Sequence, residues 1–93
     1  MERVYLKIEG RVQRVGFRRW VVYRAMEIGG LSGWVRNMED GSVELLCEGE
    51  ESAVSEMVKS CYHGPMFARV DTVLVLPYDE FLPSVQEGKF VRL

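Results

Sequence analysis

Apolar residues occupy every second position from Val4 to Ile8, and polar residues stand between them. This alternation predicts a β-strand with one buried face. From Phe17 to Ile28 the apolar residues recur three or four positions apart, which is the spacing of one helical face, and a pair of glycines follows. The change of period therefore predicts a strand, a connecting loop and an amphipathic helix that ends at the glycines.

The next segment carries the signals of a hairpin and of a second helix. Alternation returns over residues 31–35 and again over residues 43–47. Asp40-Gly41 between them is typical of a tight turn, so we expect the two strands to pair. A second helix is expected to begin at Glu50-Glu51, where the helix dipole favours acids, and to end before Gly64-Pro65.

The last part of the chain completes the order of elements. Residues 70–76 form an apolar run that predicts a fourth strand, residues 77–88 are expected to be a loop, and residues 90–93 are expected to form a short fifth strand at an edge. The order β-α-β-β-α-β predicts an α+β sandwich of the ferredoxin-like type, an antiparallel sheet with both helices on one face. With 93 residues, we expect one domain over residues 1–93.

Charge narrows the function classes. The chain has 12 basic and 14 acidic residues, a net charge of −2, which disfavours a nucleic-acid or membrane-surface protein. Four basic residues nevertheless lie close together at positions 11, 14, 18 and 19, an arrangement that suits a small anionic ligand. No apolar run approaches the roughly 20 residues that cross a bilayer. Because the first residues also lack a signal-peptide pattern, we expect a cytoplasmic protein.

Several conspicuous residues are interpreted as structural. Cys47 and Cys61 occupy apolar-patterned positions and are expected to be buried, reduced thiols, although their spacing alone leaves a disulfide open. A single histidine without a carboxylate cluster argues against a metal site. Tyr5 and Trp34 point away from the core-facing residues of their strands and are expected to form a surface pair on the open face of the sheet.

The segment from Gly10 to Arg18 leaves the first strand and enters the first helix. Unpaired backbone N–H groups converge at such a position and the helix dipole adds positive potential, so an anion can bind there. Arg18 falls in the first helical turn, where its guanidinium can donate two parallel hydrogen bonds to a phosphate. These arguments leave a second interpretation open, a solvated basic connection whose glycines only turn the chain.

Two motifs in this sequence resemble those of the acylphosphatase family. Residues 10–18 read Gly-Arg-Val-Gln-Arg-Val-Gly-Phe-Arg, and residues 33–37 read Gly-Trp-Val-Arg-Asn, followed at the family's spacing by Gly41-Ser42-Val43 and Gly49. The resemblance covers nearly the whole chain, including a Phe-x-Arg ending at Phe90 and Arg92. One position departs, because Arg14 stands where the family has glycine. If that position requires a positive φ, Arg14 adds backbone strain.

The resemblance implies an enzyme that hydrolyses the carboxyl–phosphate bond of a small-molecule acyl phosphate, without metal or cofactor. We expect the protein to act as a monomer. It implies that Arg18 and Asn37 are catalytic: Arg18 binds the phosphate and Asn37 orients the attacking water. The phosphate-binding loop it implies consists of Gln13, Arg14, Val15, Gly16, Phe17 and Arg18. Neither motif places a general acid, which suits a carboxylate leaving group, whose conjugate acid has a pKa near ~4.

Two alternatives remain. The same fold and loop could belong to a non-catalytic module that binds phosphate or carbamoyl phosphate. RNA-recognition motifs share the β-α-β-β-α-β order, but they need exposed aromatic residues on the central strands and a basic surface. The third strand, residues 42–48, lacks their consensus, and the net charge is unfavourable, so we expect no nucleic-acid partner.

Overall fold

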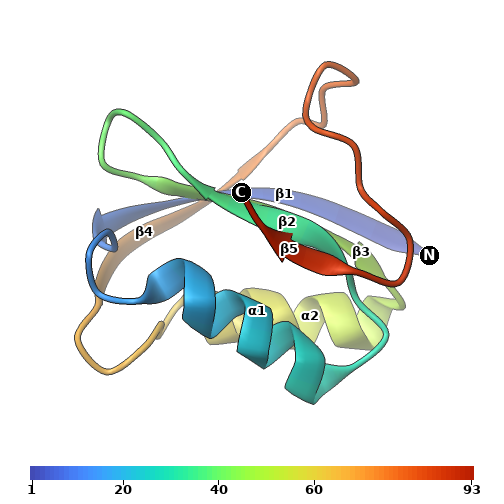
Figure 1. Ribbon diagram of the computed structural model, residues 1–93, viewed down its shortest axis with the longest axis horizontal. Helices are drawn as coiled ribbons and strands as arrows, with labels where there is room; N and C mark the ends of the chain where they lie inside the picture. The colour runs from blue at the N-terminus through green and yellow to red at the C-terminus, as the bar shows by residue number, and fades with distance from the viewer.

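Five strands form one sheet in the computed structural model, which describes residues 1–93, and two helices cover one face of this sheet (Figure 1). The elements follow in the order β1 (Glu2–Arg11), α1 (Phe17–Ile28), β2 (Ser32–Asn37), β3 (Val43–Gly49), α2 (Glu51–Cys61), β4 (Arg69–Leu76) and β5 (Phe90–Arg92). Across the sheet the strands lie in the order β4-β1-β3-β2-β5. The predicted ferredoxin-like arrangement is confirmed.

The pairing of the strands is antiparallel except at one edge. β1 pairs with β3 and β4, and β3 pairs with β2, all in antiparallel orientation. β5 instead runs parallel to β2, with Val35 opposite Arg92. The short fifth strand was expected, but the expectation of an antiparallel sheet does not hold for it. Its parallel direction follows from the loop between β4 and β5, which crosses the sheet before β5 begins (Figure 1).

The main core fills the space between the sheet and the helices. Leu6 and Ile8 of β1, Val21 of α1 and Met57 of α2 have no exposed surface, as the strand alternation and the helical period predict. Fourteen buried residues form this cluster. Because it is continuous from β1 to both helices, it fixes the position of α1 relative to the strands that flank it.

The core includes both cysteines, Cys47 of β3 and Cys61 of α2. Both are free and buried, so the expectation of reduced thiols is confirmed. Burial disfavours the charged thiolate and raises the pKa of each thiol to about 12.

The opposite face of the sheet is covered, contrary to the expectation of a surface pair. Tyr5 retains 8% of its exposure and Trp34 none, and both pack with the buried Leu46. Residues of the β4–β5 loop lie over this cluster, and Trp34 Nε1 donates to the carbonyl oxygen of Pro83 over 2.8 Å. Figure 1 shows this loop on the side of the sheet away from the helices. The prediction was wrong because strand alternation indicates the face of a side chain and not what covers that face.

A buried carboxylate ties the covered face together. Glu44 is 6% exposed, and its Oε1 accepts hydrogen bonds from the Tyr5 hydroxyl at 2.5 Å and from Arg36 Nη2 at 2.8 Å. Arg36 also stacks its guanidinium over the Trp34 ring, 4.8 Å from the centroid. Arg36 is half-buried in this network. A buried charge is tolerated only when paired and hydrogen-bonded, as Glu44 is here.

Candidate active site

The loop between β1 and α1 leaves the sheet at an irregularity in the β1–β4 pairing. The register shifts between Glu9 and Gly10, and Gly10 has φ 133°, a conformation that other residues rarely adopt. A Cβ at this position would lie 2.2 Å from the carbonyl oxygen of Arg69 on β4. Gly10 therefore lets β1 and β4 approach closely while the chain turns toward the loop.

Two buried side chains hold the ends of the loop in the main core. Val12 is 1% exposed and Phe17, the first residue of α1, is 2% exposed. Val15 between them is half-buried and packs against the same core. The backbone of residues 13–16 is thereby held at the N-terminus of α1, where the first N–H groups of the helix have no intrahelical partner.

A cavity of about 280 Å³ opens at this loop and brings Arg18 and Asn37 together. Arg18 lies in the first turn of α1, and Asn37 is the last residue of β2. The other lining residues are Val12, Arg14, Gly16, Phe17, Arg19 and Arg92. The two residues predicted to be catalytic thus share one cavity, although they lie 19 positions apart in the sequence.

The guanidinium of Arg18 is held by the last residue of the chain. Its Nη1 donates to the carbonyl oxygen of Leu93 over 2.7 Å. Leu93 is itself placed by its backbone N–H, which donates to the carbonyl oxygen of Val35 on β2 over 2.9 Å. This contact orients Arg18 from one side and leaves its Nη2 and Nε for a ligand.

Asn37 is placed by the β2–β3 hairpin. It pairs with Val43 in the register of the two strands, and the backbone N–H of Met38 donates to the carbonyl oxygen of Ser42 over 2.9 Å. The Asn37 side chain is exposed at the cavity, where its amide offers both a donor and an acceptor.

Gln13 and Val15, also predicted in the phosphate-binding loop, do not line the cavity. Gln13 points to the hairpin instead: its Nε2 donates to the carbonyl oxygens of Met38 at 2.8 Å and Ser42 at 2.9 Å. The Gln13 side chain therefore connects the loop that precedes Arg18 to the turn that follows Asn37. Only the backbone N–H groups of Gln13 and Val15 remain as donors to an anion.

Arg14, which stands where the family has glycine, adopts the left-handed backbone conformation. Its φ is 63°, and it is the one non-glycine residue of the chain with a positive φ. Holding a non-glycine residue there costs on the order of 1–2 kcal/mol. Its exposed side chain lines the cavity, where its positive charge can act on an anion.

Sequence reasoning missed two further arginines of the cavity, Arg19 and Arg92. The parallel pairing of β5 with β2 places Arg92 opposite Val35, two residues before Asn37. The Phe-x-Arg motif at Phe90 was the available signal. Arg19 follows Arg18 in the basic cluster of the loop, which already indicated an anion site.

The cavity is strongly positive. It has four arginines and no acidic residue in its lining, and none of the four forms a salt bridge. The first turn of α1 also contains no acid. In the adjacent hairpin, Asp40 pairs with Lys7 Nζ at 2.7 Å and accepts from Ser42, contacts that hold the pKa of its carboxyl well below its usual range. The site therefore has charge to bind an anion and no general acid in its lining.

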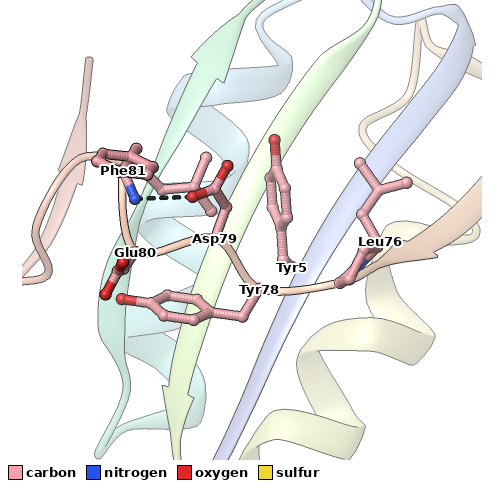
Figure 2. Close-up of a pocket in the computed structure, with 8 residues that line it drawn as sticks. Tyr5, Leu76, Tyr78, Asp79, Glu80 and Phe81 are labelled. Carbon is pink, nitrogen blue, oxygen red and sulfur yellow. Dashed lines mark hydrogen bonds between the residues drawn. The ribbon is translucent and has the colours of Figure 1, made fainter.

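A larger hollow lies elsewhere on the molecule, and its lining is acidic and aromatic instead of basic. It has a volume of about 740 Å³ and lies under the β4–β5 loop, lined in part by Tyr5, Tyr78 and Phe81. Figure 2 shows Asp79 and Glu80 at this hollow, with Asp79 accepting a hydrogen bond from the backbone N–H of Phe81 at 2.9 Å. Two carboxyls without a basic lining residue do not suit a phosphate, so the loop cavity is the better candidate.

No group of three or more His, Cys, Asp or Glu residues is arranged to hold a metal ion. No helix has both the length and the apolar character needed to cross a membrane.

The ferredoxin-like fold and the cavity that joins a basic strand-to-helix loop to Asn37 match the arrangement that the resemblance to acylphosphatases implies. The family model for acylphosphatase matches residues 4–87, and the chain belongs to this family. The resemblance predicted from the two motifs is thereby confirmed, and the comparisons support acylphosphatase function, that of a hydrolase acting on an acid anhydride.

Individual relatives agree with this assignment. An acylphosphatase of Roseiflexus sp. (strain RS-1) is 55% identical over 73 residues, which are 78% of this chain and 77% of that protein. The crystal structure of acylphosphatase from Bacillus subtilis superimposes with a TM-score of 0.85 at 34% identity and covers 100% of this chain and 99% of its own. The chain also superimposes on part of T. kodakarensis HypF, with a TM-score of 0.76 at 28% identity, and the match covers 12% of that protein.

Proposed function

We propose that this protein hydrolyses small-molecule acyl phosphates at the loop cavity, with Arg18 and backbone N–H groups binding the phosphoryl group and Asn37 orienting the attacking water. The observation that carries the proposal is the shared cavity: it joins Arg18, at the N-terminus of α1, with Asn37, at the end of β2.

Phosphate binding follows from three features of this cavity. The first intrahelical bond of α1 runs from Trp20 N to Gly16 O at 2.9 Å, so the N–H groups before Trp20 have no partner in the helix. The helix dipole adds positive potential at the same place. The guanidinium of Arg18 supplies charge-assisted hydrogen bonds, which are about twice as strong as neutral ones. Together these donors neutralise the oxygens of a phosphoryl group.

The chemistry requires little more than positioning. The oxygen of a water held by Asn37 forms the new bond to phosphorus while the bridging P–O bond breaks. The leaving carboxylate takes the electron pair of that bond, and the proton of the water passes to the phosphate product. Because the leaving group is a weak base at neutral pH, the absence of an acid from the lining does not slow the reaction. A phosphate monoester releases an alkoxide and would need that acid.

We also propose that residues 1–93 act as a single domain and a monomer in the cytoplasm, without metal, cofactor or nucleic-acid partner. The net charge of −2 supports the last point, since nucleic-acid-binding surfaces are basic. The burial of Tyr5 and Trp34 supports it further, because these are the aromatic residues of the open face that would have to stack on bases.

The test is phosphate release in the presence of a metal chelator. We expect release from acetyl phosphate and benzoyl phosphate and none from phenyl phosphate, a monoester. Arg18→Ala should raise KM and lower kcat, whereas Asn37→Ala should lower mainly kcat, by about 10²-fold or more. Arg11→Ala is the matched control, since Arg11 belongs to the same basic cluster but does not line the cavity. Undetectable release by the folded protein would contradict the proposal.

The same basic cavity also fits one alternative, a module that binds phosphate or carbamoyl phosphate without turnover. That alternative predicts binding of inorganic phosphate that depends on Arg18 and no acceleration of acyl phosphate hydrolysis. Isothermal titration with phosphate, run beside the release assay, separates the two functions.

A further inference from the structure

The loop cavity has more positive charge than one phosphoryl group requires. Arg18 and the N–H groups at the start of α1 already account for phosphate binding, and Arg14 adds a third source of positive charge beside them. Arg19 and Arg92 remain without a role in that scheme. Neither forms a salt bridge, although the chain has 14 acidic residues and places six ion pairs elsewhere.

Arg19 and Arg92 also face a second cavity. It has a volume of about 420 Å³ and is lined by these two arginines together with Val22 and Tyr23 of α1. The two arginines belong to the linings of both cavities, so the second one adjoins the proposed phosphate site. A substrate with its phosphoryl group at the loop can therefore extend its acyl group between Arg19 and Arg92.

The lining of the second cavity combines two guanidinium groups with apolar surface. Arg19 precedes Tyr23 by one helical turn, and its guanidinium lies 5.7 Å from the centroid of the Tyr23 ring. Val22 and Tyr23 offer apolar surface to a short carbon chain or ring, and the two guanidinium groups can pair with a negative group beyond it.

The position of Arg19 at the start of α1 is electrostatically unfavourable, which also indicates an anionic ligand. The first turn of α1 contains two arginines and no acid, although cations are disfavoured at a helix N-terminus. A bound phosphoryl dianion offsets the charge of Arg18. A second anion would satisfy Arg19.

We infer that the preferred substrates are acyl phosphates whose acyl group carries a second anionic group, a carboxylate or phosphate, which pairs with Arg19 and Arg92. This inference rests on the proposed function and names the substrate class within it. Arg19 and Arg92 are then specificity-determining residues: they contact the substrate away from the bond that breaks.

The experiment compares two benzoyl phosphates of nearly equal size, 4-carboxybenzoyl phosphate and 4-methylbenzoyl phosphate. The rigid ring prevents the added carboxylate from attacking the acyl group. Each kcat/KM is divided by the uncatalysed hydrolysis rate of the same compound, so that intrinsic reactivity cancels. We expect the carboxylated compound to be preferred about tenfold. Arg19→Gln and Arg92→Gln should each lower this preference by about threefold, within the range for exposed ion pairs.

Lys59→Gln is the matched control, because Lys59 is an exposed cation in the last turn of α2 and lines neither cavity. It removes one positive charge and should leave the preference unchanged. Equal or better hydrolysis of the methyl compound by the unmodified protein would overturn the inference and leave the proposed function standing. So would a preference that the Arg19 and Arg92 variants retain. No release from either compound would overturn the proposed function, and the inference with it.

Discussion

The side-chain amide of Gln13 donates to the carbonyl oxygen of Met38 over 2.8 Å, and this bond joins the loop before Arg18 to the residue after Asn37. The same nitrogen also donates to the carbonyl oxygen of Ser42, so one side chain holds both ends of the hairpin turn at the loop. The distance between the phosphate-binding and water-orienting groups of the proposed site therefore depends on a residue that does not line the cavity.

Gln13→Ala should loosen this connection. We expect kcat for benzoyl phosphate to fall about tenfold with a smaller change in KM, because Asn37 loses its position relative to Arg18 while the phosphate donors remain. The free energy of unfolding should fall by about 1–2 kcal/mol, the range for two part-buried hydrogen bonds. Steady-state kinetics and urea denaturation measure the two effects. Gln86→Ala, in the exposed β4–β5 loop, is the control. Equal kcat in both variants would show that Gln13 does not position the site.

Arg14 combines a strained backbone with a useful charge, and two substitutions separate these effects. Arg14→Gly and Arg14→Ala both remove the guanidinium from the cavity, but only glycine adopts φ 63° without strain. We expect Arg14→Gly to be more stable than Arg14→Ala by about 1 kcal/mol in urea denaturation. Both variants should raise KM to the same degree, since both lose the same charge. Equal stability of the two would mean that the backbone of this position is not strained.

The parts of the site that the sequence predicts are those set by local pattern. Arg18 and Asn37 each lie in a short motif on an element whose period is clear, and the structure places both at one cavity. Arg92 reaches that cavity only through the parallel pairing of β5 with β2, a long-range contact that a three-residue strand does not reveal. The direction of the Gln13 side chain depends likewise on the hairpin beside it.

The covered face of the sheet was missed for a similar reason. The alternation of β1 and β2 correctly separates Tyr5 and Trp34 from the residues that face the helices. Residues 77–88 have no periodicity, so nothing local indicated that this loop lies over them. Its attachment depends on single contacts between distant residues, such as the bond from Trp34 to Pro83.

Gly10 should tolerate substitution less well than another glycine with a positive φ. Gly10→Ala adds a Cβ that would lie 2.2 Å from the Arg69 carbonyl oxygen, so β1 and β4 must separate where the loop begins. Gly88→Ala is the matched control, because Gly88 has φ 79° and no atom within 4 Å of an added Cβ. We expect a loss of about 1 kcal/mol for Gly88→Ala and about 3 kcal/mol for Gly10→Ala in urea denaturation. Similar losses of stability in the two variants would indicate that the close approach of β1 and β4 at Gly10 does not contribute to the cost of the substitution.

The two buried thiols predict a loss of stability at alkaline pH. The pKa of Cys47 and of Cys61 is raised to about 12 in the folded protein, whereas an unfolded thiol ionises near ~8.5. Below that pH both the folded and the unfolded protein keep the thiol protons, and the contribution of the two thiols to the free energy of unfolding is fully present. As the pH rises toward 12, the unfolded state loses these protons first, so the free energy of unfolding falls by up to about 1.4 kcal/mol per pH unit for each thiol.

Urea denaturation between about pH 7.5 and pH 10.5, with a reductant present, measures this slope. The double variant Cys47→Ala, Cys61→Ala should be less stable at neutral pH because it leaves space in the core. Its stability should nevertheless decline less steeply above about pH 8.5, because no thiol remains to ionise in the unfolded chain. The comparison uses slopes, so the cost of the cavities cancels. Parallel pH profiles for the two proteins would show that other groups, such as Tyr5, cause the alkaline loss.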